Sequence, residues 1–124
     1  MESPGDIKLY SYSKCSTCRK AISWLEERNI KFEILDIITT PPSKEILQKA
    51  LSFIQERKLL FNTNGLSYRN LGAINIKAMK DEEALDALSS DGKLIKRPFL
   101  IFDNRCFLTG FNVDAWHEFF DKIE

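Results

Sequence analysis

The sequence has few of the residues, and none of the long segments, that mark several large classes of protein. It holds a single histidine among 124 residues, and its 18 acidic and 18 basic residues give a net charge of zero. A neutral chain has no global attraction to nucleic acid or to an anionic membrane, so we expect neither as a direct partner. No apolar run approaches the length needed to cross a bilayer. Residues 1–6 (MESPGD) are polar and acidic, so we expect no secretory signal peptide.

Cysteine is also scarce, with three residues in the chain. An odd number does not make the disulfide framework of a small secreted protein, and a reducing cytoplasm fits it best. What the chain does have is apolar material. Hydrophobic residues make up 44% of it and aromatic residues 11%, enough to bury the core of one domain spanning residues 1–124.

Two of the cysteines stand where a predicted strand meets a predicted helix. Residues 7–12 (IKLYSY) alternate apolar and polar side chains, which is the period of a strand. From Ala21 onward the apolar residues follow the spacing of a helix. Cys15 and Cys18 lie between the two segments, and a C-x-x-C pair in this position is typical of thioredoxin-like redox sites.

The predicted start of the helix gives the two thiols different roles. The first turn of a helix presents unpaired N–H groups and a positive dipole end, which favour a thiolate over a thiol. Cys15 is expected there, with Lys14 and Arg19 adding positive charge, so we predict a lowered pKa and the role of nucleophile. Cys18 lies one turn further in, where it would serve as the resolving thiol.

Two structural interpretations of the pair remain as alternatives. A closed zinc site needs four ligands, and the remaining Cys106 and His117 are distant and not at ligand spacing, so we expect no metal. The pair could also be two inert cysteines near a helix start. Cys106 itself falls in a predicted strand, as a small buried residue, and His117 is expected at the solvent edge of the last helix.

The rest of the chain alternates strand and helix signals. Residues 32–38 predict a strand buried on both faces, parallel to the first and joined to it by a right-handed crossover. Ser43 is expected to cap a helix, followed by helical turns near residues 59–61 and 68–71. A helix opening on the acids at 81–83, a hairpin over 99–108 and a helix from 113 complete the order. We therefore predict an α/β fold, a thioredoxin-like three-layer sandwich with a helical insert, about residues 43–92, before the C-terminal hairpin.

Arg97 and Pro98 directly precede the predicted third strand. In a thioredoxin-like layout this proline faces the cysteine pair, and we expect a cis bond before it, although a trans proline at a strand start is the ordinary alternative. Arg97 would then direct its guanidinium at the thiols. That group suits the bidentate capture of an oxyanion, or of the carboxylate of a thiol such as glutathione. Arg69 is expected on a solvated face of the insert, with a second anion contact as the alternative.

Four segments together resemble one known family over almost the whole chain. The resemblance includes the TPP turn at residues 40–42 and the KRP at residues 96–98. The segments are residues 10–43 (YSYSKCSTCRKAISWLEERNIKFEILDIITTPPS), 61–72 (FNTNGLSYRNLG), 91–104 (DGKLIKRPFLIFDN) and 107–116 (FLTGFNVDAW). They are similar to the arsenate reductase family of glutaredoxin-linked type, which includes the Spx transcription regulators.

The resemblance implies a first alternative, an arsenate reductase dependent on glutathione and glutaredoxin. In such enzymes one cysteine attacks arsenate and three arginines hold the oxyanion, and Cys15 and Arg97 match the cysteine and one arginine. The other two arginines are expected near Phe61 and residues 109–110, where this sequence has none. Cys18 is instead a second thiol that those enzymes lack at this position, and an internal pair favours a disulfide cycle within the protein.

The second alternative is a redox-sensing regulator. Spx proteins carry the same pair as a switch and bind the C-terminal domain of the RNA polymerase α subunit through a glycine at the end of their second helix. Residues 55–58 (QERK) contain no glycine, so RNA polymerase is not the favoured partner. The resemblance thus implies a cytoplasmic thiol–disulfide oxidoreductase that binds no cofactor and is reduced by glutathione, glutaredoxin or thioredoxin. Its expected catalytic residues are Cys15, Cys18 and Arg97, supported by Lys14, Arg19 and Pro98.

Overall fold

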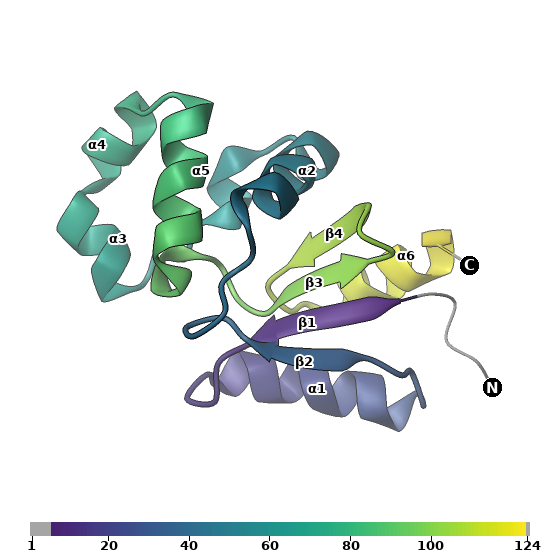
Figure 1. Ribbon diagram of the computed structural model, residues 1–124. Coiled ribbons are helices and arrows are strands. Elements are labelled where there is room, and N and C mark those ends of the chain that lie inside the picture. The colour runs from purple at the N-terminus through teal and green to yellow at the C-terminus, as the bar shows by residue number, and fades with distance from the viewer. Residues whose placement is uncertain (1–5, 124) are drawn as a thin grey trace.

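A four-stranded sheet forms the centre of the molecule. The computed structural model describes residues 6–123, and its strands lie in the order β2-β1-β3-β4 (Figure 1). Strand β1 pairs in parallel with β2, whereas the β1–β3 and β3–β4 pairs are antiparallel. The strands are β1 (Ile7–Ser11), β2 (Glu33–Asp36), β3 (Phe99–Phe102) and β4 (Cys106–Thr109).

Helices cover both faces of the sheet, which confirms the predicted α/β sandwich. Helices α1 (Ser16–Glu27) and α6 (Val113–Ile123) lie on one face. The other face carries α2 (Lys44–Ile54) and α5 (Asp81–Ser90), with the rest of the insert beyond them (Figure 1). The smaller elements of the insert are η1 (Arg57–Leu60), α3 (Leu66–Leu71), α4 (Ala73–Ala78) and η2 (Gly92–Leu94). No helix in the described part of the chain is long and apolar enough to span a membrane.

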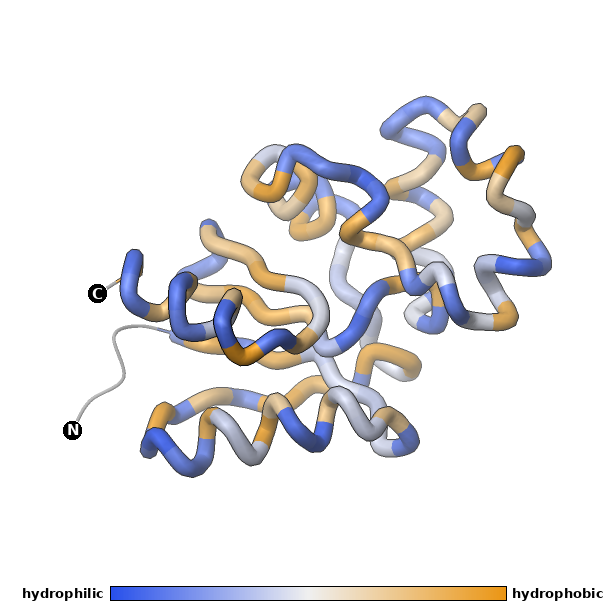
Figure 2. Tube along the Cα trace, turned by 180° about the vertical axis from the view of Figure 1, so that it is seen from behind, coloured by the Kyte–Doolittle hydropathy of each residue, from blue (hydrophilic) through white to orange (hydrophobic). Residues whose placement is uncertain are grey.

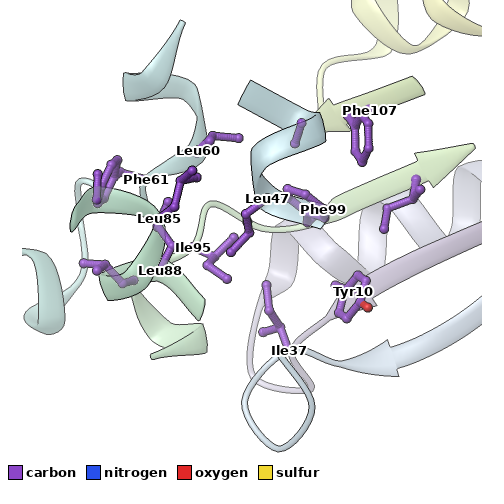
Figure 3. Packing of buried hydrophobic residues seen from close by; sticks show 14 of the residues in the cluster. Tyr10, Ile37, Leu47, Leu60, Phe61, Leu85, Leu88, Ile95, Phe99 and Phe107 are labelled. Carbon is purple, nitrogen blue, oxygen red and sulfur yellow. The ribbon is translucent and has the colours of Figure 1, made fainter. Parts of the chain in front are cut away.

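The alternation along each central strand divides the buried residues into two cores. In β1, Leu9 packs toward α1 and α6, while the next residue, Tyr10, packs toward the insert (Figure 3). All four residues of β3 are buried because helices cover both of its faces. The hydropathy of the trace shows the same layout, with apolar residues along the central strands and in stripes on the helices (Figure 2).

Most predicted elements are confirmed, and local chemistry explains their ends. Ser43 caps α2, since its hydroxyl accepts a hydrogen bond from the Ile46 N–H at 3.2 Å. Acidic residues fill the first turn of α5, where they oppose the positive end of the helix dipole. Helix α4 was not among the predicted elements. Its six residues are too few for a hydrophobic period to stand out.

The prediction for the second strand was wrong in its burial. The strand is shorter than residues 32–38, and Ile34 is 53% exposed, because β2 is an edge strand at the end of the sheet. The chain is buried again just past the strand, at Ile37. There Gly92 approaches so closely that a Cβ on it would collide with the Ile37 carbonyl oxygen. This contact joins the end of the insert to the end of β2.

Candidate functional site

The first cysteine of the pair lies at the mouth of a helix, as predicted. Cys15 is the N-cap of α1, and its own N–H donates to the Tyr12 carbonyl at 3.0 Å, closing the turn after β1. The Cys18 N–H donates to the Cys15 sulfur at 3.3 Å. An N–H in the first turn has no acceptor within the helix, so the sulfur takes up a hydrogen bond that the helix itself leaves unused. That bond stabilises a thiolate more than a thiol.

The two thiols have opposite environments. Cys18 is fully buried, whereas Cys15 is half-buried. Burial, with the adjacent Cys15 thiol, raises the pKa of Cys18 to about 11. Burial also works to raise the pKa of Cys15, but hydrogen bonds from the Cys18 thiol and N–H, with the charge of Arg97, outweigh it and hold that pKa below its usual value. The Cys15 thiol therefore ionises more readily than an ordinary thiol, and the Cys18 thiol less readily.

Arg97 reaches the pair from the opposite side of the site. Strand β3 is antiparallel to β1, with Phe99 opposite Tyr10, so the start of β3 lies beside the end of β1. The Arg97–Pro98 bond is cis, as predicted, and Pro98 is buried. The Arg97 guanidinium lies 4.9 Å from the centre of the Tyr12 ring, in a cation–π contact. Stacking of this kind holds a long flexible side chain beside the thiols.

The cations next to Cys15 in the sequence have other surroundings. Lys14 and Arg19 are exposed, and the Arg19 guanidinium donates to the Ser13 carbonyl at 2.9 Å, bracing the turn before the helix. The positive charge that lowers the pKa of Cys15 comes instead from Arg97, which lies 82 residues further along the sequence. Proximity in the sequence was thus a poor guide to which cation faces the sulfur.

A cavity of about 390 Å³ opens beside Cys15. Two cationic residues, Arg97 and Lys96, line it. The other lining residues include polar and aromatic ones: Asn62, Asn64, Thr109, Phe111, Asn112 and Trp116. None of the residues that line it carries a carboxylate. Sequence reasoning missed Asn62 and Asn64, because only the folded insert brings this loop to the site. Lys96 did carry a signal, since it directly precedes Arg97.

The other residues considered from the sequence lie away from this cavity. Phe61 is buried in the core, and Arg69 is exposed on α3. Cys106 is half-buried and packs against the core beneath α1 and α6. His117 is exposed, as predicted, with its ring 5.3 Å from that of Trp24. Among residues 6–123, no three histidine, cysteine or acidic side chains gather in a way that would hold a metal ion.

Comparisons with known proteins place the chain in one family. The model of the ArsC family matches residues 10–119. The chain is 43% identical over 118 residues to the uncharacterized protein YusI of Bacillus subtilis, covering 90% of this chain and 96% of that protein. It is 31% identical over 117 residues to the global transcriptional regulator Spx of Streptococcus agalactiae, covering 94% of this chain and 84% of Spx.

A solved structure is similar over the same length. The crystal structure of "a possible arsenate reductase" from Streptococcus mutans matches with a TM-score of 0.84 at 33% sequence identity, covering 91% of this chain and 98% of that chain. Together with the strand order, this likeness confirms the thioredoxin-like fold predicted from the sequence.

Proposed function

The chain belongs to the ArsC family, and from this premise we propose that it is a cytoplasmic thiol–disulfide oxidoreductase using Cys15 and Cys18. The observation that carries the proposal is the contrast between the two thiols. Cys15 is accessible from a cavity and has a lowered pKa, whereas Cys18 is buried within one helical turn of it and has a raised pKa. A nucleophile and a resolving thiol need this division.

The proposed cycle transfers two electrons from the protein to a disulfide. The Cys15 thiolate attacks one sulfur of the substrate, forming a mixed disulfide and releasing the other half as a thiolate, which takes a proton from water. Cys18 then gives up its proton and attacks the Cys15 sulfur, releasing the second half as a thiol. The substrate disulfide is reduced to two thiols, and the protein is left with a Cys15–Cys18 disulfide. An external thiol reductant (glutathione, a glutaredoxin or a thioredoxin) restores the dithiol by the reverse exchange.

Arg97 has a supporting catalytic role in this cycle. Its charge favours the thiolate of Cys15, and a sulfur-to-sulfur exchange places no oxyanion in its reach. Pro98 fixes the start of β3 beside the pair. Lys14 and Arg19 support the turn and the local charge from outside the cavity.

An arsenate reductase is a second candidate, favoured by the two cations that line the cavity beside Cys15. The residues that line the cavity argue against arsenate reduction. A tetrahedral dianion is best held by several guanidinium groups, and the cavity contains one. The sequence also has no arginine at Phe61 or at residues 109–110, where the family resemblance places the other two.

A redox-sensing regulator is the remaining candidate, favoured by the similarity to Spx. The same Cys15–Cys18 pair would then act as a switch rather than in turnover. The end of α2, where the polymerase-binding glycine of Spx is expected, carries Gln55 in a left-handed conformation. That residue keeps the backbone shape of a glycine but presents a long polar side chain, which a docking partner would have to accommodate.

The experiment that separates these candidates measures two activities side by side. Reduced protein is assayed with arsenate, glutathione and glutaredoxin, and in a thioredoxin-coupled assay with a disulfide substrate. We expect disulfide turnover, and weak or no arsenate turnover. Arg97→Lys, which keeps the charge but not the bidentate fork, is expected to retain most of the disulfide activity, and Arg97→Ala to lose about tenfold or less.

The opposite pattern would reject the proposal. Robust arsenate reduction that disappears in Arg97→Lys would identify an arsenate reductase with an incomplete arginine set. Turnover of neither substrate, together with reversible oxidation of the pair, would favour the regulator.

A further inference from the structure

The cavity beside Cys15 contains two cations, and the structure gives them different neighbours. The Arg97 guanidinium stacks on Tyr12, approaches the Lys93 carbonyl at 3.5 Å, and acts on the Cys15 sulfur. Lys96 is not among the groups that shift the pKa of Cys15. Arg97 therefore acts on the nucleophile, whereas the Lys96 ammonium is left to interact with another group in the cavity.

The Lys96 side chain lies against Gly110. The Lys96 N–H donates to the Leu60 carbonyl at 2.9 Å, and the Gly110 N–H donates to the Pro98 carbonyl at the same distance. These bonds fix both backbones. A Cβ on Gly110 would lie 2.9 Å from the Lys96 Cε and 3.7 Å from its Nζ, so the lysine stem occupies space that only a glycine leaves open. Its ammonium lies at the cavity wall beside Gly110.

Within residues 6–123, the lysine forms no ion pair. No carboxylate lies within 4.0 Å of Lys96 among the residues described, and none lines the cavity. Asn62, Asn64 and Asn112 line the same cavity, and a side-chain amide can donate to an oxygen, although the Asn62 amide already donates to the Lys93 carbonyl at 3.4 Å. An ammonium without a carboxylate partner, in a cavity that amide side chains also line, is suited to bind an anion.

We propose that Lys96 determines specificity by binding a carboxylate on the small-molecule disulfide that Cys15 attacks. This inference rests on the proposed function. A cavity of about 390 Å³ lies within the size range of small-molecule sites. The lysine holds the carboxylate, the half-buried Phe111 contacts the carbon chain, and one sulfur of the disulfide is presented to Cys15. The exchange then proceeds as in the proposed cycle, with no change in its balance of atoms and electrons.

The test compares two alkylating probes of nearly equal shape, iodoacetate and iodoacetamide. Only the first carries a carboxylate. Both react with the Cys15 thiolate, so the ratio of their rates cancels any change in the pKa of that thiol. The rates on Cys15 are read by peptide-resolved mass spectrometry, and the ratio is referred to that of a small free thiol in the same buffer.

We expect the wild-type ratio to exceed that of the free thiol, and Lys96→Met to lower it about fivefold, the effect of losing one partly exposed charge pair. Lys96→Arg keeps the charge and is expected to retain the preference. Lys20→Met is the matched control, since Lys20 is an exposed lysine on α1 outside the cavity wall. A ratio that is equal in wild type and Lys96→Met, or that falls equally in Lys20→Met, overturns the inference.

A second arm links the result to turnover. Dithiodipropionate and its diamide differ only in charge, and wild type is expected to prefer the acid in kcat/KM, with the preference lost in Lys96→Met. Turnover of both disulfides with no dependence on Lys96 would sink this inference and leave the proposed function standing. A Lys96-dependent alkylation ratio with no disulfide turnover would do the reverse, since the anion site would be real and the proposed reaction wrong.

Discussion

At the scale of single residues, the chemistry of the site rests on a difference between two thiols three positions apart. Cys15 receives an N–H of the helix start and the influence of Arg97, and Cys18 is sealed in the core one turn later. The same helix that exposes the first sulfur buries the second. Because a thiolate is the reactive form, the two cysteines are expected to react over separate ranges of pH.

The first prediction concerns that separation. The rate of Cys15 alkylation by iodoacetamide should rise with pH and level off with a midpoint below that of a small free thiol in the same buffer, because its lowered pKa gives thiolate already at lower pH. The rate at Cys18 should still be rising as the pH nears its pKa of about 11. Peptide-resolved mass spectrometry after short pulses of reagent follows both sites in one sample.

Two substitutions at Cys18 serve as matched controls. Cys18→Ala removes the thiol that hydrogen-bonds to the Cys15 sulfur, so the midpoint for Cys15 should move up. Cys18→Ser keeps a donor at that place, and the midpoint should move less. If Cys18 were alkylated at lower pH than Cys15, the two roles would be reversed.

At the scale of elements, the end of α2 shows where the backbone is under strain. Its C-cap, Gln55, has φ of 63°, a left-handed conformation that costs a non-glycine residue about 1 kcal/mol or more. Gln55→Gly is therefore expected to raise the free energy of unfolding by about 0.5–1 kcal/mol, measured by urea denaturation. Gln55 does not line the cavity beside Cys15, so the disulfide exchange activity should be unchanged.

Gln48→Gly in the same helix is the control for that prediction. Gln48 is exposed in the interior of α2, where glycine costs about 1 kcal/mol relative to a good helix former. The two substitutions should thus have opposite signs. A loss of stability in Gln55→Gly as large as in Gln48→Gly would mean that the left-handed cap is not strained.

Sequence patterns predicted the elements better than their surroundings. The strand period of β1, the Ser43 cap and the acidic start of α5 are local features, and each was confirmed. The exposure of β2 depends on its place at the edge of the sheet, which an apolar run does not reveal. Asn62 and Asn64 reach the cavity only through the fold of the insert, and no local pattern marks them.

At the scale of the whole molecule, the site is a meeting point of the sheet and the insert. Cys15 follows β1, Arg97 precedes β3, and Gly110 follows β4. The insert adds its own wall, held in place where the Thr109 hydroxyl donates to the Leu59 carbonyl at 2.7 Å. The ends of the strands thus place Cys15, Lys96 and Arg97 at the cavity, and the insert loop adds Asn62 and Asn64 to its wall.

The central claim is that Cys15 attacks and Cys18 resolves, and trapping the mixed disulfide tests it most directly. Reduced protein is mixed with an aromatic disulfide, the released thiol is counted, and the adduct is located by peptide mapping. Wild type should release two thiols per chain and end with a Cys15–Cys18 disulfide and a free Cys106. Cys18→Ser should release one and hold a stable adduct on Cys15, Cys15→Ser should form no adduct on Cys18, and Cys106→Ser should behave as wild type. An adduct on Cys18 in Cys15→Ser, or a Cys15–Cys106 bridge in wild type, would contradict the account.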